Sequence, residues 1–424
     1  MFSDYLYIKG IMLKHWKKGC IHCHTLWSDG LALPEMAIMK YQELGYDFLC
    51  LADHNLFQDQ DDVWMPVHSK NGDWPPDLYY DEYDRAMAAI PDAIETRRLG
   101  FRTFVHLSTF AQLKERYHRP GRFLLFPGEE LTDVAVSFEE ETRKYDLHVN
   151  VFNIAKDLPC PDKGTDKDIL HAIIDNYNEV ANEGSFLMVN HPWSRVWDVD
   201  PRLLIDTPEI RHFEICNNGS NDMPEEWIYN REQYWDFVLA HRLAKGNGII
   251  YGVASDDAHY YDDAYRGKHT CCGSGWLMVD CMGELTEQNI ASSLKNGNFY
   301  SSNGVYINDI EFNARTGTLE VNVQAEPGLK YRIDFITTKK NFDRHMELKE
   351  FTLDNAIRCR TRPVIPEGIG RIASSVDGTS ASYAMESDDL YVRALITSNR
   401  PGMLKAPHYP RFESAWTQPY PNCR

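Results

Sequence analysis

The amino-acid sequence predicts an α/β protein, with a parallel sheet or barrel up to about residue 300 and an all-β module after it. Short apolar runs of strand length alternate with helix-like stretches in the first part, and β-like runs separated by Gly-, Ser- and Pro-rich turns follow. Six or seven of the first runs end in His, Asp or Glu. Catalytic residues of parallel barrels lie at the C-terminal ends of the strands, so the same pattern predicts where a site lies.

Seven apolar runs lead to metal-type or amide side chains. Runs of this length, bounded by polar or Gly residues, are typical of buried strands. In order they are Ile21 before His22, 48–52 before Asp53 and His54, 123–126 before Glu129 and Glu130, 147–152 around His148, 186–190 before His191, 213–216 before Asn217, and 249–254 before Asp257 and His259.

Helix-like stretches lie between several of these runs. Residues 34–44 begin with Pro and are followed by Gly, which is the usual order of helix start and stop signals. Residues 166–182 place apolar side chains on one face, and residues 225–245 precede a Gly. This alternation favours parallel strands joined by helices.

Two domains are expected, at 1–300 and 301–424, with an insertion in the first at about 58–122. The insertion is rich in Trp, Pro and Tyr and then helix-like. It forms either a lid or pocket wall near the site, or a surface excursion with its own small core. The second domain is expected to be a small β-sandwich with a mobile loop at 373–389, and its β-like runs are 306–312, 318–324, 331–337, 390–396 and 413–417.

Composition excludes several classes of protein. The 424 residues include 63 acidic and 44 basic side chains, and a net charge of −19 argues against a general nucleic-acid surface. No apolar run reaches the ~18 residues of a membrane span, so we expect no membrane partner. The ten Cys are scattered, which favours reduced thiols and a cytoplasmic protein, or a periplasmic or secreted one if a signal peptide has been removed.

The 16 His of this acidic chain suit a metal site. His22 and His24 form a His-x-His pair, and on a strand both imidazoles point to the same side. Asp257 and His259 repeat this spacing, and Asp29 lies in a turn that either folds over the site or is capped by its carboxylate. One of two adjacent acids, Glu129 or Glu130, can bridge two cations; we favour Glu130, and Asp256 and Asp257 leave a similar choice.

The expected metal ligands exceed the three or four of a single catalytic zinc site. Nitrogen and carboxylate donors suit Zn²⁺, Mn²⁺ or Fe²⁺, so two or three divalent transition-metal ions are expected. The ligands are His22, His24, Asp29, His54, Glu130, His148, His191, Asp257 and His259.

The order of these motifs resembles the polymerase and histidinol phosphatase (PHP) superfamily. The resemblance spans residues 19–260 and rests on His22-x-His24, Ser28-Asp29-Gly30, Asp53-His54, Gly128-x-Glu130, His148, His191-Pro192 and Asp257-x-His259. It implies a distorted barrel of seven parallel strands with up to three metal ions at its C-terminal rim. It also implies a first ion held by His22, His24, Glu130 and Asp257, a second by Glu130, His148 and His191, and a third by Asp29, His54 and His259.

The expected activity is metal-assisted hydrolysis of a phosphate ester, either a phosphomonoester or a phosphodiester, on a small phosphorylated substrate. Arg195 and Asn217 are the expected substrate-binding residues, and the sequence indicates no oligomeric state. The residues expected to act in catalysis are His22, His24, Glu130, Asp257 and His259.

Two alternatives remain open at this stage. The same metal site could act as a hydrolase or lyase on a carbohydrate or an amide, with Trp and Tyr side chains of the insertion stacking on sugars. A non-catalytic metal-binding module is the other alternative, and the complete ligand set argues against it.

Overall fold

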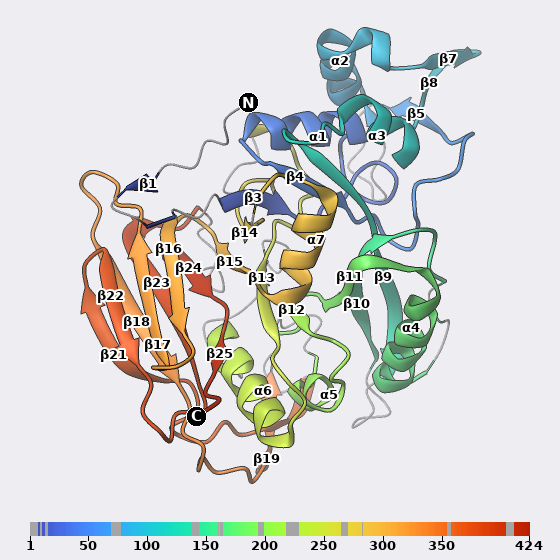
Figure 1. Cartoon of the computed structure of the whole chain (residues 1–424). Coiled ribbons are helices and arrows are strands. Elements are labelled where there is room, and N and C mark those ends of the chain that lie inside the picture. Colours follow the sequence, from blue (N-terminus) through green and yellow to red (C-terminus); the bar gives the residue numbers. More distant parts are fainter. Residues whose placement is uncertain are drawn as a thin grey trace.

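The computed structural model describes residues 7–8, 11–12, 16–68, 78–136, 144–159, 161, 164–193, 199–217, 229–263, 270–281, 283–353, 358–403 and 411–424. A large sheet runs through both halves of the chain, and the strand-rich C-terminal part lies to one side of the helix-bearing part (Figure 1). Among the described residues, no helix combines the length and the apolarity needed to cross a bilayer.

Seven strands of the first half follow one another in the sheet. The strands β3, β4 and β9 are mutually parallel, and β11, β12 and β13 form a second parallel set. Most of their central residues are apolar and buried, as expected for strands covered on both faces. The bounds are β3 Trp16–Cys20, β4 Phe48–Leu51, β9 Leu124–Val136, β10 Lys144–Ile154, β11 Ala181–Val189, β12 His212–Cys216 and β13 Tyr251–Ala254.

The expectation of seven parallel strands is wrong at β10. This strand is antiparallel to both of its neighbours, β9 and β11. Only residues 137–143 separate β9 from β10, and a parallel connection needs a crossover of a dozen or more residues. The short connection therefore dictates a hairpin, which reverses the strand that carries His148.

The two ends of this seven-strand stretch meet just beyond β3 and β13. Cys23 and Ala258 form a parallel bridge, in which His24 N donates to Ala258 O at 2.9 Å. Asp257 N donates to His22 O at 3.1 Å. A complete barrel remains a prediction, but this contact places the segments after the first and last strands side by side.

The expected helices are present with shorter bounds. The stretch 166–182 gives α4 Asp166–Val180, whose capping box pairs Thr165 with Asp168. The stretch 225–245 gives α6, which begins at Arg231 and ends before Gly246, where φ is +80°. Outside the insertion, the other helices described in this half are α1 Pro34–Glu43, α5 Pro201–Asp206 and α7 Glu287–Asn296.

The insertion has a small sheet of its own but shares its core with the segment after His24. Its four strands have the order β6-β5-β8-β7, and Val67, Val105 and Ala86 are buried in one cluster with Leu26 and Trp27. Both the surface excursion and the lid remain predictions. The part expected to be helix-like also contains a β-hairpin, formed by β7 and β8. The bounds of the insertion's elements are β5 Trp64–His68, β6 Leu78–Tyr79, α2 Tyr80–Ala89, a 3₁₀ turn Pro91–Ala93, β7 Thr96–Leu99, β8 Arg102–His106 and α3 Phe110–Tyr117.

The C-terminal strands extend the large sheet and add a second one. The large sheet continues through β14, β15, β24, β23, β18 and β21, and β16, β17 and β22 form the other layer. Because β15 pairs with both β14 and β24, the sheet is continuous across the expected boundary at 300. The bounds are β14 Trp276–Asp280, β15 Phe299–Ser302, β16 Ile307–Asn313, β17 Thr318–Val323, β18 Tyr331–Thr337, β21 Arg371–Asp377, β22 Ser380–Ala384, β23 Tyr391–Pro401 and β24 Phe412–Thr417.

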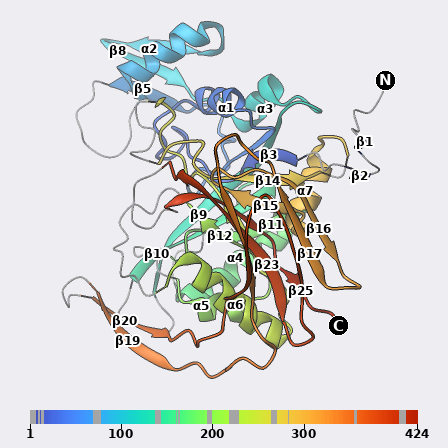
Figure 2. The same cartoon turned by 90° about the vertical axis from the view of Figure 1, so that its left-hand side faces the viewer.

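The expected loop at 373–389 is largely strand, since most of β21 and all of β22 fall within it. Each pairs with a different layer, β21 with β18 and β22 with β17. Three small pairings complete the chain: β1 Tyr7–Ile8 with β2 Ile11–Met12, β19 Leu348–Leu353 with β20 Arg358–Pro363, and β25 Tyr420–Pro421 with β23. Figure 2 shows β19 and β20 running beneath α5 and α6.

A buried ion pair joins α6 to the C-terminal sheet. Arg393 Nε lies 2.8 Å from Asp236 Oδ1 and Arg393 Nη2 lies 2.5 Å from Asp236 Oδ2. The Tyr391 hydroxyl donates to the same carboxylate at 2.7 Å. Both charges are nearly inaccessible to solvent, so the two halves of the chain are joined by polar contacts as well as by the apolar core.

Candidate metal centre

His22 and His24 lie just beyond β3, on the segment that bridges to Ala258. Their Nε2 atoms are 3.2 Å apart and lie 3.3 Å and 3.1 Å, respectively, from Asp257 Oδ1. The intervening Cys23 turns away, and its Sγ donates to Cys50 O. The alternation expected of an extended segment therefore brings both imidazoles to one carboxylate.

Glu130 occupies the middle of the cluster. Its Oε1 lies 2.9 Å from His148 Nδ1 and 3.3 Å from His22 Nε2. Its Oε2 lies 3.1 Å from His54 Nδ1 and 3.2 Å from His24 Nε2. Although this side chain is buried, Oε2 has no hydrogen-bond partner among the described residues. A buried carboxylate with four imidazoles around it fits a bridging metal ligand.

Asp29 anchors the outer side of the cluster. Its Oδ2 lies 3.1 Å from His259 Nε2 and 3.5 Å from His54 Nε2, and its Oδ1 lies 3.5 Å from His24 Nδ1. This carboxylate therefore faces the site across three imidazoles.

Within this cluster, three groups of side chains could each hold an ion, because their ligand atoms lie within 4.8 Å of one another. His191 lies at the margin, with its Nε2 3.9 Å from Glu130 Oε1. The structure thus brings all nine expected ligands into one cluster, although His54 approaches Glu130 as well as Asp29. The groups are His24, Asp29, His54 and His259; His22, His24 and Asp257; and His54, Glu130 and His148.

The first acid of each adjacent pair faces away from the cluster. Glu129 accepts a hydrogen bond from Leu158 N at 2.8 Å, and burial together with Asp157 raises the pKa of Glu129 to about 8. Asp256 accepts from Ser274 N at 2.6 Å and Gly275 N at 2.8 Å. Glu130 and Asp257, which are both among the ligands expected from the sequence, are therefore the members of each pair that reach the site.

Two cluster residues have unusual backbone conformations. Asp257 has φ of +49° and His191 has φ of +30°, in the region that non-glycine residues rarely adopt. Such conformations cost free energy and persist where the surrounding structure holds them. At Asp257 this conformation makes the carboxylates of Asp256 and Asp257 point in different directions.

Glu214 is a functional candidate that the sequence reasoning missed. This fully buried side chain of β12 places Oε1 2.6 Å from His22 Nδ1 and accepts from His191 N through Oε2 at 2.8 Å. Ser255 also donates to it. The signal was available, since an acid inside the apolar run 213–216 needs polar partners when it is buried.

Asp53 shapes the loop that carries His24 and Asp29. It accepts hydrogen bonds from Thr25 N at 2.7 Å, Ser28 Oγ at 2.7 Å and Gln58 Nε2 at 2.6 Å. Asp53 therefore stabilises the loop that carries two expected ligands.

Burial and charge shift the cluster's pKa values in opposite directions. Burial by itself lowers the pKa of His24, but hydrogen bonds with Asp257 and Glu130 outweigh it and raise the pKa to about 10. Burial also raises the pKa of Glu130 by itself, but the surrounding histidines lower it well below its usual range. Protons and metal ions compete for the same imidazole nitrogens, so the negative field that raises the pKa of His24 also favours a cation.

Of the two expected substrate-binding residues, Arg195 and Asn217, the structure describes only Asn217. Arg195 lies outside the described residues. Asn217 is fully buried, and its Nδ2 donates to Glu214 Oε2 at 2.7 Å, so it supports the residue behind His22. A direct substrate contact by Asn217 remains a prediction.

A buried cation near β12 was also missed. Arg231 is 7% exposed, lies 4.8 Å above the Trp193 ring, and has no ion pair among the described residues. Trp193 in turn donates to Glu214 O at 2.5 Å. A buried guanidinium that forms no ion pair with the residues the structure describes suits an anionic ligand.

The aromatic side chains proposed for sugar stacking are in part covered. Arg97 lies 4.1 Å above the Trp64 ring, and His106 lies beside the same ring. Trp74 lies outside the described residues. The covered ring gives no support to a carbohydrate platform at Trp64.

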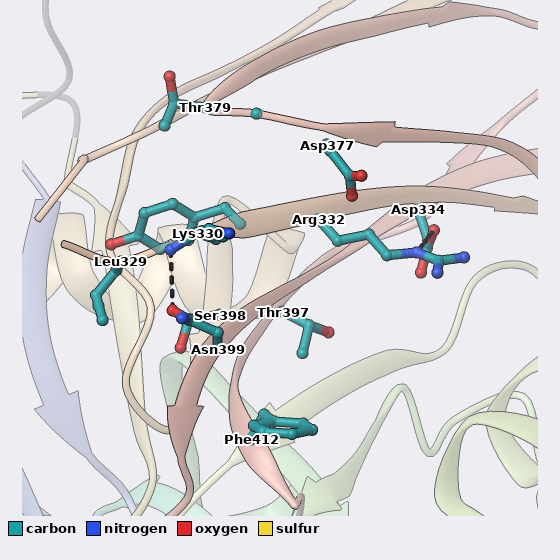
Figure 3. A pocket seen from close by; sticks show the side chains of 12 residues that line it. Leu329, Lys330, Arg332, Asp334, Asp377, Thr379, Thr397, Ser398, Asn399 and Phe412 are labelled. Carbon is teal, nitrogen blue, oxygen red and sulfur yellow. Dashed lines mark hydrogen bonds and ion pairs between the residues drawn. The ribbon is translucent and has the colours of Figure 1, made fainter.

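A cavity lies on the C-terminal sheet, and it is separate from the metal-ligand cluster (Figure 3). It encloses about 650 Å³ on the face formed by β18, β21 and β23, and none of the nine expected ligands lines it. Arg332, Asp377 and Phe412 border it.

Comparison with known proteins gives weak likenesses. No protein-family model matches the chain, and no curated protein matches it significantly. A two-domain protein from Bacteroides vulgatus, containing a predicted PHP-like metal-dependent phosphoesterase, is similar at 14% identity and a TM-score of 0.40, covering 96% of this chain and 95% of its own.

Two further solved structures match part of the chain. A candidate metal-dependent phosphoesterase from Bifidobacterium adolescentis has 13% identity and a TM-score of 0.30, covering 58% of this chain and 90% of its own. An amidohydrolase from Chromobacterium violaceum has 13% identity and a TM-score of 0.26, covering 57% of this chain and 87% of its own. Likenesses this weak establish neither a shared fold nor an activity, so function must be inferred from the cluster itself.

Proposed function

We propose that this chain is a metal-dependent hydrolase of the PHP type, with a di- or trinuclear centre that hydrolyses a phosphate ester. One observation carries the proposal: six imidazoles and three carboxylates converge in a single cluster, with Glu130 between its parts. Scattered structural histidines do not produce this arrangement of ligand atoms.

The donor set fits divalent transition-metal ions such as Zn²⁺, Mn²⁺ or Fe²⁺. When bound, such ions supply Lewis acidity, which acidifies a water molecule and polarises the scissile ester. The residues that would hold them are those of the three groups, together with His191 at the margin.

The chain's own residues prepare the ligands. His22 donates a hydrogen bond from Nδ1 to Glu214 Oε1, and His259 donates one from Nδ1 to the backbone carbonyl of Asp257 at 2.9 Å. Both rings therefore keep Nε2 free to face the carboxylates of the cluster. Such fixed tautomers are typical of metal-ligating histidines.

Arg231 is our candidate for binding the substrate's phosphate, beside Arg195. It supplies a buried, permanently charged group next to the end of β12, and Trp193 fixes its plane. In this proposal the ions and the arginine, rather than the acidic surface, attract the phosphate.

Metal analysis coupled to a panel of phosphomonoesters and phosphodiesters tests the proposal. Wild type is expected to carry two or three transition ions per chain and to hydrolyse at least one class of ester. His22→Ala is expected to lose metal and activity, whereas His345→Ala, which changes an exposed His elsewhere, keeps both. A metal-replete and active His22→Ala protein would overturn the assignment. A metal-replete wild type inert on every phosphate ester but active on an amide or a glycoside would move the function to the alternative substrates.

A further inference from the structure

The β7–β8 hairpin of the insertion presents an apolar tip to solvent. Leu99 and Phe101 are 58% and 101% exposed, and Gly100 between them has φ of +62°. Leu99 pairs with Arg102, so two residues form the loop, and a Gly with positive φ at its first position is typical of a tight type II′ turn. The tip is therefore an ordered projection of two large side chains.

Three arginines surround this tip. Between residues 96 and 103 the sequence contains Arg97, Arg98 and Arg102 and no acid, although the whole chain has a net charge of −19. The side chains of Arg98 and Arg102 form no ion pair or hydrogen bond within the described parts of the chain. Arg97 lies over Trp64 at the base of the hairpin, and the first acid before it, Glu95, lies 3.9 Å from His106 Nδ1. The positive charge near the tip is thus not neutralised locally.

The hairpin also reaches outward. Figure 1 shows β7 and β8 extending from α2 to the outer edge of the molecule, away from the large sheet. No described element covers the tip: a Cβ added at Gly100 would meet no atom within 4 Å. A flat surface could therefore approach it without meeting the rest of the protein.

We propose that this hairpin docks the protein on an anionic lipid surface, with Leu99 and Phe101 entering the interface and the arginines binding lipid phosphates. Nucleic acid would use the arginines but leave two apolar side chains in water. A stable protein interface requires about 800 Å² and 20–30 residues from each partner, which a tip of six residues does not supply. A bilayer requires only a few inserted apolar groups and a few basic residues beside them.

This docking site is independent of the proposed hydrolase activity, and it needs no membrane-spanning segment. Salt should weaken it, because the arginines act through screened charge at an exposed surface. Neutral lipid should bind the protein less well than anionic lipid, since only the apolar part of the contact remains.

Co-sedimentation of the full chain with vesicles tests the proposal. The vesicles contain phosphatidylcholine alone or with about one-third phosphatidylglycerol, at low and at high salt. Wild type is expected to sediment with the anionic vesicles at low salt, and the double substitutions Leu99→Ser/Phe101→Ser and Arg98→Gln/Arg102→Gln should each lower the partition by on the order of tenfold. Ile372→Ser, which alters a side chain 52% exposed on β21, is the matched control and should not change it.

Two results would overturn the proposal: wild type that stays in solution with anionic vesicles, or sedimentation that is equal for neutral and anionic lipid or for wild type and both tip variants. Circular dichroism of each variant checks that the fold is intact. Because no readout depends on catalysis, a failure here leaves the hydrolase proposal standing, and an inactive enzyme leaves the docking result interpretable.

Discussion

Glu214 Oε1 lies 2.6 Å from His22 Nδ1, and both side chains are fully buried. The carboxylate lies behind the imidazole and fixes the tautomer whose Nε2 faces Glu130 and Asp257. Such partners of ligating histidines are worth about 10–100-fold in metal affinity.

We therefore predict that Glu214→Gln weakens metal binding by about tenfold while retaining the fold, because the amide keeps the size but not the charge of the acceptor. Competition with a chelator measures this change. Asp206→Asn, which alters an exposed ion pair with Lys245, serves as the control. Unchanged affinity in Glu214→Gln would rule out a positioning role for Glu214.

The adjacent acids Asp256 and Asp257 are expected to respond in opposite ways. Asp256→Ala should destabilise the protein by about 3 kcal/mol or more, because it removes hydrogen bonds to Ser274, Gly275 and Tyr41 and leaves buried donors unpaired. Asp257→Asn should lower bound metal and activity with a smaller loss of stability. Urea unfolding and metal analysis of the two variants distinguish these roles, and loss of metal from a folded Asp256→Ala protein would contradict them.

Arg231→Met should raise KM for a phosphate ester more than it lowers kcat, if the guanidinium binds the phosphate throughout the reaction. Steady-state kinetics on the ester found in the panel give both constants. Arg231→Lys should restore part of the lost affinity, since it keeps the charge but not the planar fork. A variant with wild-type KM would remove Arg231 from the substrate site.

Arg393→Ala should destabilise the protein by about 3–5 kcal/mol, because it leaves the buried carboxylate of Asp236 without its partner. Lys245→Ala breaks an exposed ion pair and should cost no more than about 1 kcal/mol. Denaturant unfolding compares the two variants. Similar small losses in both would show that the contact between α6 and the C-terminal sheet does not depend on the buried pair.

His212 should make stability depend on pH. Its ring is buried against Phe186 and its Nε2 donates to Leu294 O, and burial lowers its pKa to about 3 from an ordinary value near 6.5. Between these values the unfolded chain binds a proton that the folded protein does not. The contribution of His212 is therefore complete above pH ~6.5 and falls as the pH decreases toward 3.

The test is the difference between wild type and His212→Gln in urea unfolding at two pH values. From pH ~7.5 to pH ~5.5, wild type should lose about 1.4 kcal/mol more than the variant, which has no group titrating at this position. Equal losses in the two proteins would show that His212 is protonated in the folded state. Comparing the two proteins removes the contribution of the cluster's own carboxylates and histidines.

Local pattern was enough to predict much of the fold. The apolar runs before His54, His191 and Asp257 are the buried strands β4, β11 and β13, because a strand buried on both faces must be apolar along its length. The β-like runs of the C-terminal part are strands for a related reason, since alternating residues face the core between the two layers. Which strands pair with one another could not be predicted from the local apolar pattern. The hairpin formed by β9 and β10 and the strands within 373–389 were therefore missed.

The sequence by itself determined which residues could be ligands, because a polar side chain that directly follows a buried strand must lie at the end of that strand. Only the tertiary structure decided which of them face one another. Glu130 rather than Glu129 enters the cluster, Asp257 rather than Asp256 reaches His24, and Glu214 orients His22 from another strand. These choices depend on contacts between segments up to 233 residues apart, which no local pattern encodes.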